Sequence, residues 1–186
     1  MKHRSRISAC GAFAVALFTA AAPAAAATNH VVFAGGCFWG VQAVFESVRG
    51  VTGTVAGFAG GASGTAHYDI VSTGMTGHAE SVDVTYDPAK VSFKELLDVY
   101  FLVAHDPTEL NRQGPDEGSQ YRSEIFYTSE AQLRDSRAYI VTLERRHVFS
   151  APIVTKLEPY RGFYRAEDYH QDYLVHNPGA SYIVYN

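Results

Sequence analysis

The residue of this chain best suited to nucleophilic or redox chemistry is the cysteine of Gly35-Gly36-Cys37-Phe38-Trp39-Gly40. Glycines there allow a tight turn and let another molecule approach the backbone closely. A cysteine in the first turn of a helix lies beside unpaired N–H groups, so we expect a lowered thiol pKa. A lone cysteine is commonly buried and inert. The flanking glycines and aromatic residues nevertheless favour a reactive thiol.

Two long polar segments hold further candidate residues. Gly60–Gly77 is rich in glycine, serine and threonine, and His105–Ser123 has almost no aliphatic residues. Segments of this length in a compact domain are usually functional or disordered. The second ends in Gln120, Tyr121 and Arg122, three side chains that can form hydrogen bonds to a ligand and that a simple connecting loop does not need.

Several stretches in and around these segments resemble, in the same order, the A-type peptide methionine sulfoxide reductases. The resemblance covers residues 30–174, nearly all of the chain after its N-terminal segment. The matching stretches are Gly36–Gly40, Gly74–Glu80, Tyr86–Pro88, His105–Thr108, Arg112–Gly114, Asp116–Ser123 and Ala166–Gln171.

The resemblance implies roles for four catalytic residues. The family's nucleophile falls on Cys37 and its proton-donating glutamate on Glu80. Its two oxygen-binding tyrosines fall on Tyr68 and Tyr121. The implied reaction is reduction of methionine S-sulfoxide, free or in proteins, to methionine, with a sulfenic acid on the cysteine as intermediate.

The resemblance also implies three substrate-binding residues. Phe38 and Trp39 match the aromatic wall that holds the substrate methyl group. Asp116 matches an aspartate near the substrate. We expect no bound cofactor and no metal. The partners would be oxidised proteins, free methionine sulfoxide and a thiol donor.

The same residue types make chemical sense without a family name. A sulfoxide S–O bond breaks poorly unless its oxygen receives a proton or strong hydrogen bonds. One preorganised donor at such an oxygen is worth roughly 3–4 kcal/mol. Tyrosine hydroxyls remain protonated at neutral pH, and a carboxylic acid kept neutral by an apolar pocket would serve better still. Glutamate is ordinarily a solvated surface residue, so Glu80 must be buried to play this part.

The sequence departs from the family at two places. Many relatives have resolving cysteines near the C-terminus, whereas Ser181–Asn186 contains none. The sulfenic acid would then be reduced from outside, by a thioredoxin-like or glutaredoxin-like protein or by a small thiol. Thr65-Ala66-His67 stands before Tyr68, where relatives usually have Asn-Pro-Thr.

Other functions remain open at this point. A cysteine hydrolase could use His78 or His170 as the base for Cys37. A non-enzymatic binding module of the cell envelope could use an aromatic pocket built from Trp39, Tyr160, Phe163, Tyr164, Tyr169 and Tyr173. The scattered histidines and the few cysteines do not match the spacing of a zinc site.

The N-terminal segment has the three-part pattern of a secretory signal peptide. Lys2, Arg4 and Arg6 precede an apolar run, and the small residues Ala24–Ala27 follow it. The apolar run is shorter than the ~20 residues of a membrane span. We therefore expect residues 1–27 to be a signal peptide, cleaved after Ala26 or Ala27, and residues 28–186 to form one catalytic domain of an exported, periplasmic protein.

Export would change the cysteine count and the charge. Cys10 would be removed, leaving one cysteine, and an unpaired cysteine in an exported protein suggests a reactive thiol. Of 15 basic residues 12 would remain against 19 acidic ones, a net charge of −7. No basic stripe or aromatic platform is present in the sequence, so we do not expect nucleic acid as a partner. We expect a monomer without stable membrane association.

The elements that must position these residues follow from periodicity. Alternation and helical spacing predict strands at His30–Ala34, Val51–Phe58, Ser81–Tyr86, Glu124–Tyr127 and Ile153–Leu157. They predict helices at Phe38–Val48, Phe93–Ala104, Glu130–Arg146 and Ala166–Leu174, the second behind a capping box of Ser92 and Glu95. The order predicts an α+β domain with a ferredoxin-like split βαβ core (βαββαβ), an extra helix and long loops.

Overall fold

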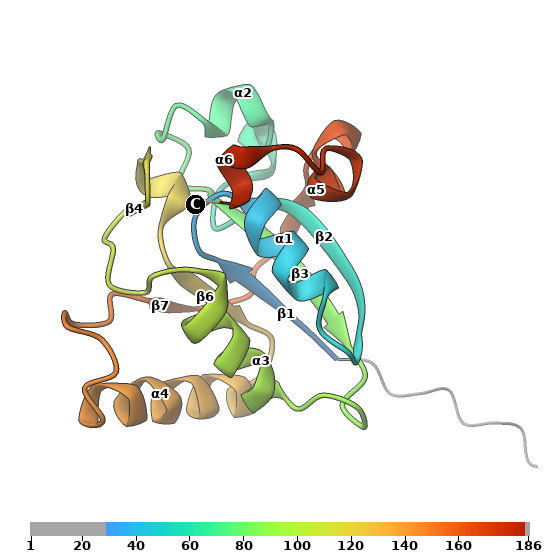
Figure 1. The fold of residues 1–186 in the computed structure, drawn as a ribbon. Coiled ribbons are helices and arrows are strands. Elements are labelled where there is room, and N and C mark those ends of the chain that lie inside the picture. The colour runs from blue at the N-terminus through green and yellow to red at the C-terminus, as the bar shows by residue number, and fades with distance from the viewer. Residues whose placement is uncertain (1–28, 185–186) are drawn as a thin grey trace, which may run out of the picture.

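The structure, a computed structural model, describes residues 29–184 (Figure 1). The expected signal peptide therefore lies outside the described residues. The strands are β1 (Asn29–Ala34), β2 (Val51–Ala59), β3 (Ala79–Tyr86), β4 (Arg112–Gln113), β5 (Asp116–Glu117), β6 (Glu124–Tyr127), β7 (Lys156–Pro159) and β8 (Phe163–Arg165). The α-helices are α1 (Phe38–Glu46), α2 (Tyr68–Val71), α3 (Phe93–Val99), α4 (Glu130–Arg145), α5 (Tyr173–His176) and α6 (Ser181–Val184).

Six of the strands form one mixed sheet in the order β7-β6-β1-β3-β2-β8. Neighbouring strands are antiparallel except β6 and β7, which are parallel. In the centre of the sheet Val31 pairs with Val84, and Phe58 pairs with Glu80. Strands and helices thus form the mixed arrangement of the expected α+β class.

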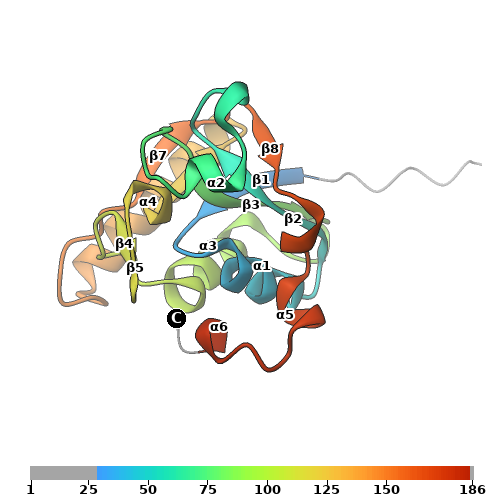
Figure 2. The ribbon, with the colours of Figure 1, turned by 90° about the horizontal axis from the view of Figure 1, so that it is seen from above.

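The two faces of the sheet pack against different apolar clusters. Val31 and Phe33 point to the main core, where they pack with residues of α1, α3 and α4. Val32 and Ala34 point to a smaller apolar cluster with Phe126 and Tyr160. The period of two along β1 therefore divides its side chains between two cores. Figure 2 shows α1 and α3 together on one side of the sheet.

The sheet is strongly curled. β7 and β8 lie at its opposite edges, yet only residues 160–162 join them. So short a link spans at most about 14 Å. The two edges must therefore approach each other over the smaller core, which β7, β8 and their link help to cover.

The helix signals in the sequence are confirmed in their local detail. Ser92 and Glu95 form both halves of the capping box, and the Ser129 side chain caps α4 by accepting from Gln132 N–H. The second predicted helix changes character, because α3 ends at Val99 and a turn of π-helix continues over Tyr100–Ala104. Among the described residues no helix has the length and apolar character to span a bilayer.

Two predicted elements are wrong. The helix predicted at Ala166–Leu174 is broken by Asp172, whose φ is +51°. Gln171 bonds the backbone N–H and C=O of Ala56 at 2.9 Å each, so tertiary contacts replace helical ones. The strand predicted at Ile153–Leu157 lies instead at Lys156–Pro159, because it pairs there with β6. The strand β8 had no sequence prediction.

Candidate active site

The cysteine lies at the turn between the central strand β1 and the helix α1. Cys37 is the N-cap residue of α1, and its C=O accepts from Gly40 N–H at 3.2 Å. Gly36 has a φ of +91°, and a Cβ on it would lie 2.6 Å from the Gln113 side chain. Only glycine fits such a position without strain. The glycine before the cysteine therefore fixes the direction in which Cys37 leaves the sheet.

A buried hydrogen-bond network supports this turn from behind. The Tyr100 hydroxyl donates to Ala34 C=O at 2.7 Å, directly before the two glycines. His105 Nδ1 lies 2.9 Å from Tyr100 C=O and Nε2 lies 2.7 Å from the Ser123 hydroxyl. Burial lowers the pKa of His105 to about 4. The ring is therefore neutral, with Nδ1–H as donor and Nε2 as acceptor.

Glu80 lies beside the cysteine turn, on strand β3. Its side chain is 2% exposed, and its Oε2 accepts from Phe38 N–H at 3.1 Å. Burial raises the pKa of Glu80 to about 8, although the Phe38 N–H opposes the rise and Asp116 adds to it slightly. At neutral pH the carboxyl group is thus mainly protonated, with one oxygen held by the helix N-terminus and the other able to donate.

The expectation of a lowered thiol pKa is wrong for the substrate-free protein. Burial raises the pKa of Cys37 well above its ordinary value, and the negative charge of Glu80 raises it further. The backbone N–H groups of Trp39 and Gly40 lower it, as the helix position predicts, but they do not compensate. The desolvation of the thiolate outweighs the helix N-terminus. Because Glu80 keeps its proton at neutral pH, its contribution is smaller there.

The two predicted tyrosines come from different segments, and both lie within electrostatic reach of Glu80. Tyr68 begins α2, and Tyr121 ends a 3-10 turn over Ser119–Tyr121. Burial, followed by the charge of Glu80, raises the pKa of each hydroxyl. Both hydroxyls therefore stay protonated and can donate hydrogen bonds toward the same region as Glu80.

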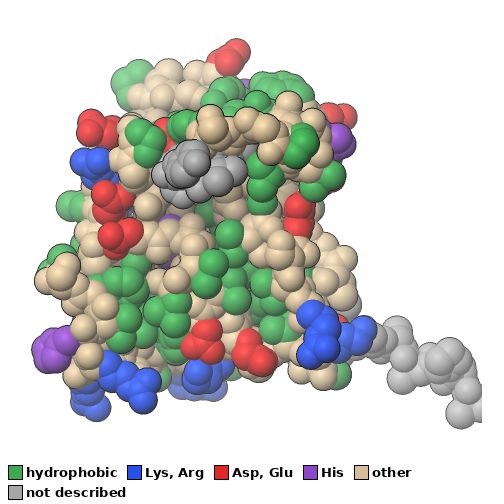
Figure 3. All heavy atoms as spheres, viewed as in Figure 1, with side chains coloured by type: hydrophobic (Ala, Val, Ile, Leu, Met, Phe, Trp, Pro, Cys, Tyr) green, Lys and Arg blue, Asp and Glu red, His purple; other side chains and the backbone are tan. Residues whose placement is uncertain are grey.

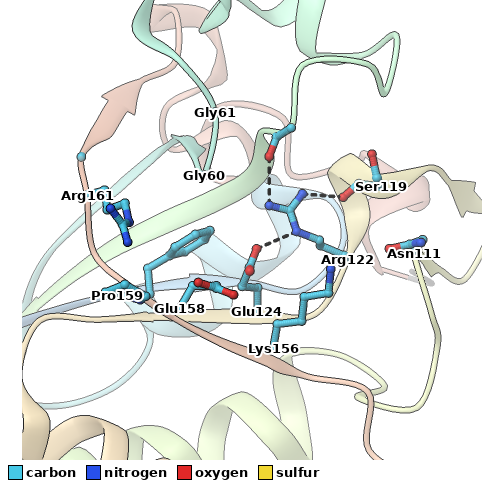
Figure 4. Close-up of a pocket in the computed structure, with 13 residues that line it drawn as sticks. Gly60, Gly61, Asn111, Ser119, Arg122, Glu124, Lys156, Glu158, Pro159 and Arg161 are labelled. Atoms are coloured by element: carbon cyan, nitrogen blue, oxygen red, sulfur yellow. Dashed lines mark hydrogen bonds and ion pairs between the residues drawn. The ribbon is translucent and has the colours of Figure 1, made fainter.

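The two loops are tied together, which fixes Tyr121 relative to β3. The Ser119 hydroxyl donates to Gly74 C=O at 2.9 Å. Arg122 donates to the C=O of Ser119, Gly77 and His78, and its Nε lies 2.6 Å from Glu124 Oε2. Figure 4 shows this arginine between the glycine loop and Glu124. Arg122, next to the predicted tyrosine, thus holds the two loops together. The sequence pattern did not predict this structural role.

The predicted aromatic wall is formed unequally by its two members. Phe38 is 1% exposed and packs on the Phe58 and His170 rings. It therefore forms the buried base of the predicted methyl-binding wall. Trp39 is partly exposed and stacks on Tyr173 with ring centroids 3.8 Å apart. Its indole N–H donates to His170 Nδ1 at 3.0 Å. Trp39 is therefore the member of the pair that offers surface to a ligand.

Asp116 has a partner that the sequence did not reveal. It lies in the short β4–β5 hairpin, and its carboxylate accepts a hydrogen bond from the Tyr182 hydroxyl of α6. The negative charge of Asp116 raises the pKa of Cys37, which places it within electrostatic reach of the thiol. Figures 1 and 2 show α6 beside the N-terminal end of α1. Without tertiary contacts, Tyr182 is one of twelve tyrosines and carries no signal.

The histidines do not support the alternative functions. Gly61 N–H donates to His78 Nδ1, and His78 Nε2 lies 3.0 Å from Ala62 C=O, so both ring nitrogens are engaged. His170 Nδ1 is engaged by Trp39. Neither ring has the pairing with Cys37 that a hydrolase needs. No cluster of three or more His, Cys, Asp or Glu suited to a metal occurs among the residues described.

The binding-module alternative also finds no aromatic cage at the expected residues. Trp39 and Tyr169 pack on the His170 ring, and Tyr173 stacks on Trp39. Tyr160 and Phe163 instead pack on the smaller core. A cavity of about 480 Å³ lies beside the smaller apolar cluster (Figure 4). Its lining includes Gly60, Arg122, Glu124, Lys156 and Arg161 but not Cys37.

The charged side chains are unevenly placed on the surface. Figure 3 shows Lys and Arg side chains gathered along the lower edge of one face, away from α6.

Comparison with known proteins decides between these functions. A family model described as peptide methionine sulfoxide reductase matches residues 29–186. The chain belongs to this family. It is 55% identical over 163 residues to peptide methionine sulfoxide reductase MsrA 2 of Mesorhizobium japonicum, covering 88% of this chain and 84% of that protein. With the protein of the same name from Synechocystis it shares 51% identity over 157 residues, covering 84% and 73% respectively.

Solved structures of the family agree. Mxr1 of Saccharomyces cerevisiae in its reduced form has a TM-score of 0.77 and 34% identity, covering 82% of this chain and 87% of Mxr1. Mxr1 in complex with Trx2 has a TM-score of 0.55 and 26% identity, covering 78% and 84%. As a peptide methionine sulfoxide reductase, this chain is an oxidoreductase that reduces methionine sulfoxide with thiols. The recognition made from the sequence motifs is confirmed.

Proposed function

We propose that this chain reduces methionine S-sulfoxide, free or in proteins, through Cys37 and a protonated Glu80. The observation that carries the proposal is the buried Glu80 carboxyl, held by the N–H of the residue that follows the cysteine. A neutral carboxylic acid at this place can protonate an oxygen that bears developing negative charge.

The proposed first step transfers two electrons to the substrate sulfur. Cys37 sulfur attacks the sulfoxide sulfur and forms an S–S bond with it, while Glu80 protonates the oxygen, which Tyr68 and Tyr121 hold by hydrogen bonds. The S–O bond breaks, and the oxygen leaves as water with the Glu80 proton and the thiol proton. Water then attacks the Cys37 sulfur, the S–S bond breaks, methionine leaves, and an S–OH group forms on Cys37. The proton that this water releases restores the acid. Burial raises the pKa of Cys37, so the thiol keeps its proton in the substrate-free protein.

We propose that an external thiol then reduces the sulfenic acid. One thiol displaces the hydroxyl as water and forms a mixed disulfide with Cys37. A second thiol attacks that disulfide and releases the free cysteine. Cys37 is the only cysteine that the structure describes, so no partner for an internal disulfide is found there. The solved complex of the similar Mxr1 with Trx2 supports a thioredoxin-type donor.

A turnover assay with each epimer of a methionine sulfoxide peptide tests the proposal. With dithiothreitol as reductant, we expect turnover of the S epimer and none for Cys37→Ser. Ser47→Ala, at the other end of α1, is the matched control and should retain activity. Equal turnover by the Cys37→Ser protein would refute the proposal, and cleavage of a peptide or ester bond would indicate the hydrolase.

Mass spectrometry tests the intermediate. After one equivalent of sulfoxide without any thiol, a sulfenic-acid reagent should label Cys37 alone. Adding a thioredoxin whose second active-site cysteine is replaced should give a mixed disulfide at Cys37. An unlabelled Cys37 after complete sulfoxide consumption would contradict the intermediate.

We infer that the centre of the sheet is the ferredoxin-like split βαβ core. Support comes from the four strands β6-β1-β3-β2, which are antiparallel throughout. In chain order they alternate as strand, α1, strand, strand, α3, strand, which is the βαββαβ pattern. β7, β8 and α4 would be additions to this core.

We also propose that residues 1–27 are a signal peptide and that the enzyme works in the periplasm. The support is the basic, apolar and small-residue pattern of that segment. Expression of the full chain followed by N-terminal sequencing of the cell-envelope fraction tests it. A mature protein that starts at Ala27 or Thr28 is expected, and an intact N-terminus in the cytosol would contradict export.

A further inference from the structure

One carboxylate, that of Glu167, lies between two parts of the substrate site. Its Oε1 accepts from the backbone N–H of Tyr68 at 3.2 Å. Its Oε2 lies 4.0 Å from His170 Nε2, and Oε1 lies 4.0 Å from His67 Nδ1. Glu167 Oε2 and His170 Nε2 are both buried, and neither has a hydrogen-bond partner within the part of the chain that the structure describes. The two atoms therefore face each other at ion-pair distance.

The tautomer of His170 is fixed from its other side. Trp39 Nε1–H donates to His170 Nδ1 at 3.0 Å, so Nδ1 has no proton. Burial lowers the pKa of His170, and the neutral ring therefore has its proton on Nε2. Nε2 lies 4.0 Å from Glu167 Oε2, which is ion-pair distance but beyond the reach of a direct hydrogen bond. The indole N–H, the imidazole and the Glu167 carboxylate thus follow one another in space.

The Glu167 carboxylate therefore lies at the contact between two separate elements of the chain. Trp39 comes from α1, and Tyr68 comes from α2 in the long glycine-rich segment. The His170 ring fills the space between them, with centroids 4.3 Å from the Tyr68 ring and 5.6 Å from the Trp39 ring. No hydrogen bond between Trp39 and Tyr68 is found in the described structure, so their spacing depends on the residues behind them.

We propose that Glu167 is the positioning residue that sets the spacing of Trp39 and Tyr68 around the bound sulfoxide. The inference rests on the proposed function, in which Tyr68 holds the oxygen, and on the methyl-binding role that the family resemblance implies for Trp39. In this proposal Glu167 acts only through other residues. It fixes Tyr68 through a backbone N–H and Trp39 through His170.

His67 lies at the solvent-facing end of this group of residues. Its side chain is 66% exposed, so its 4.0 Å contact with Glu167 is screened by water. The proposal therefore assigns little to His67. A His67→Thr variant should retain catalytic efficiency within about twofold of the starting protein.

Glu167→Gln is the decisive variant because it keeps the size of the side chain. The amide oxygen can still accept from Tyr68 N–H, but the amide N–H₂ then meets the Nε2–H of His170. A neutral ring can receive that amide only by moving its proton to Nδ1, where Trp39 already donates. Turning the amide round places its N–H₂ against Tyr68 N–H instead. One of the two anchoring contacts is therefore lost in either orientation.

The experiment compares Glu167→Gln with Asp168→Asn in the purified enzyme. Asp168 is the neighbouring acidic residue, and its side chain is 93% exposed. For Glu167→Gln we expect kcat/KM for the sulfoxide peptide to fall about 10-fold to 100-fold, the range for a small misplacement of binding groups. The rate of Cys37 alkylation by iodoacetamide should stay within about twofold. Trp39, the only tryptophan, should show a changed emission maximum.

The outcomes separate this proposal from the proposed function. Normal kcat/KM in Glu167→Gln, or an equal loss in Asp168→Asn, would overturn the positioning role. A loss of Cys37 alkylation in step with kcat/KM would also overturn it, because the effect would then be general unfolding of the site. An active Cys37→Ser protein would instead refute the reductase mechanism itself, whatever the Glu167 variants show.

Discussion

The Phe38 backbone N–H donates to Glu80 Oε2 at 3.1 Å across 42 positions of sequence. This bond joins the helix that starts at the nucleophile to the strand that bears the acid. It also occupies one carboxyl oxygen, so the proton of the neutral acid lies on the other. The geometry explains how a glutamate can be both buried and directed, since the N–H satisfies the group that burial would otherwise leave unpaired.

Glu80→Gln should lower kcat by about 10²–10⁴, because general acid catalysis contributes roughly that factor. The amide can still accept from Phe38 N–H, so the fold should persist. Stopped-flow or steady-state reduction of the S-sulfoxide peptide measures the loss. Glu158→Gln, on the exposed part of β7, is the matched control and should leave kcat unchanged. A kcat within threefold of the starting protein would exclude Glu80 as the acid.

The stability of the protein should fall between about pH 4.5 and pH 8. Burial raises the folded pKa of Glu80 from 4.5 to about 8, so in this window the unfolded chain loses a proton that the folded protein keeps. The contribution of Glu80 is fully present below the lower value and is lost as pH rises through the upper one. Its limiting slope is ~1.4 kcal/mol per pH unit. Urea unfolding at several pH values measures it, and Glu80→Gln should lack this slope. Equal slopes in the two proteins would contradict a raised Glu80 pKa.

Gly36→Ala should destabilise the protein and reduce its activity. The backbone at Gly36 has a φ of +91°, and the added Cβ would lie 2.6 Å from Gln113. The strained conformation alone costs about 1–2 kcal/mol, and the clash would move the β4 strand away from the cysteine turn. Thermal unfolding and turnover measure both effects. Gly64→Ala adds a Cβ with no atom within 4 Å, and it should leave both unchanged. A Gly36→Ala protein as stable as Gly64→Ala would show that this turn is not constrained.

Tyr182→Phe should raise KM for the sulfoxide peptide by about threefold to tenfold, with a smaller effect on kcat. The variant removes one hydrogen bond to the Asp116 carboxylate, a type worth roughly 1.5–3 kcal/mol when sheltered, and the exposure of Tyr182 reduces this. Steady-state kinetics give the two constants separately. Tyr169→Phe, with a ring that is 63% exposed, is the control. An unchanged KM would show that the α6 contact does not affect substrate binding.

The sequence by itself determined the family and most of the elements. The glycines, cysteine and aromatic residues at 35–40 predicted a reactive strand–helix turn, and the ordered motifs predicted the family. The alternation in Ser81–Tyr86 and the Ser92–Glu95 capping box predicted their elements, because such patterns reflect local backbone geometry. These features depend on residues only a few positions apart.

Only the tertiary structure decided the ionisation of the site and its distant supports. A helix N-terminus predicts a lower pKa for Cys37, but desolvation depends on everything packed around the thiol and raises it instead. The broken helix at Asp172 follows from contacts with Gln42 and Ala56, more than 100 positions away in sequence. Tyr182 and Glu167 reach the site through the same kind of contact. Burial and long-range hydrogen bonds involve residues that no local pattern connects, so the fold had to bring them together before their roles could be read.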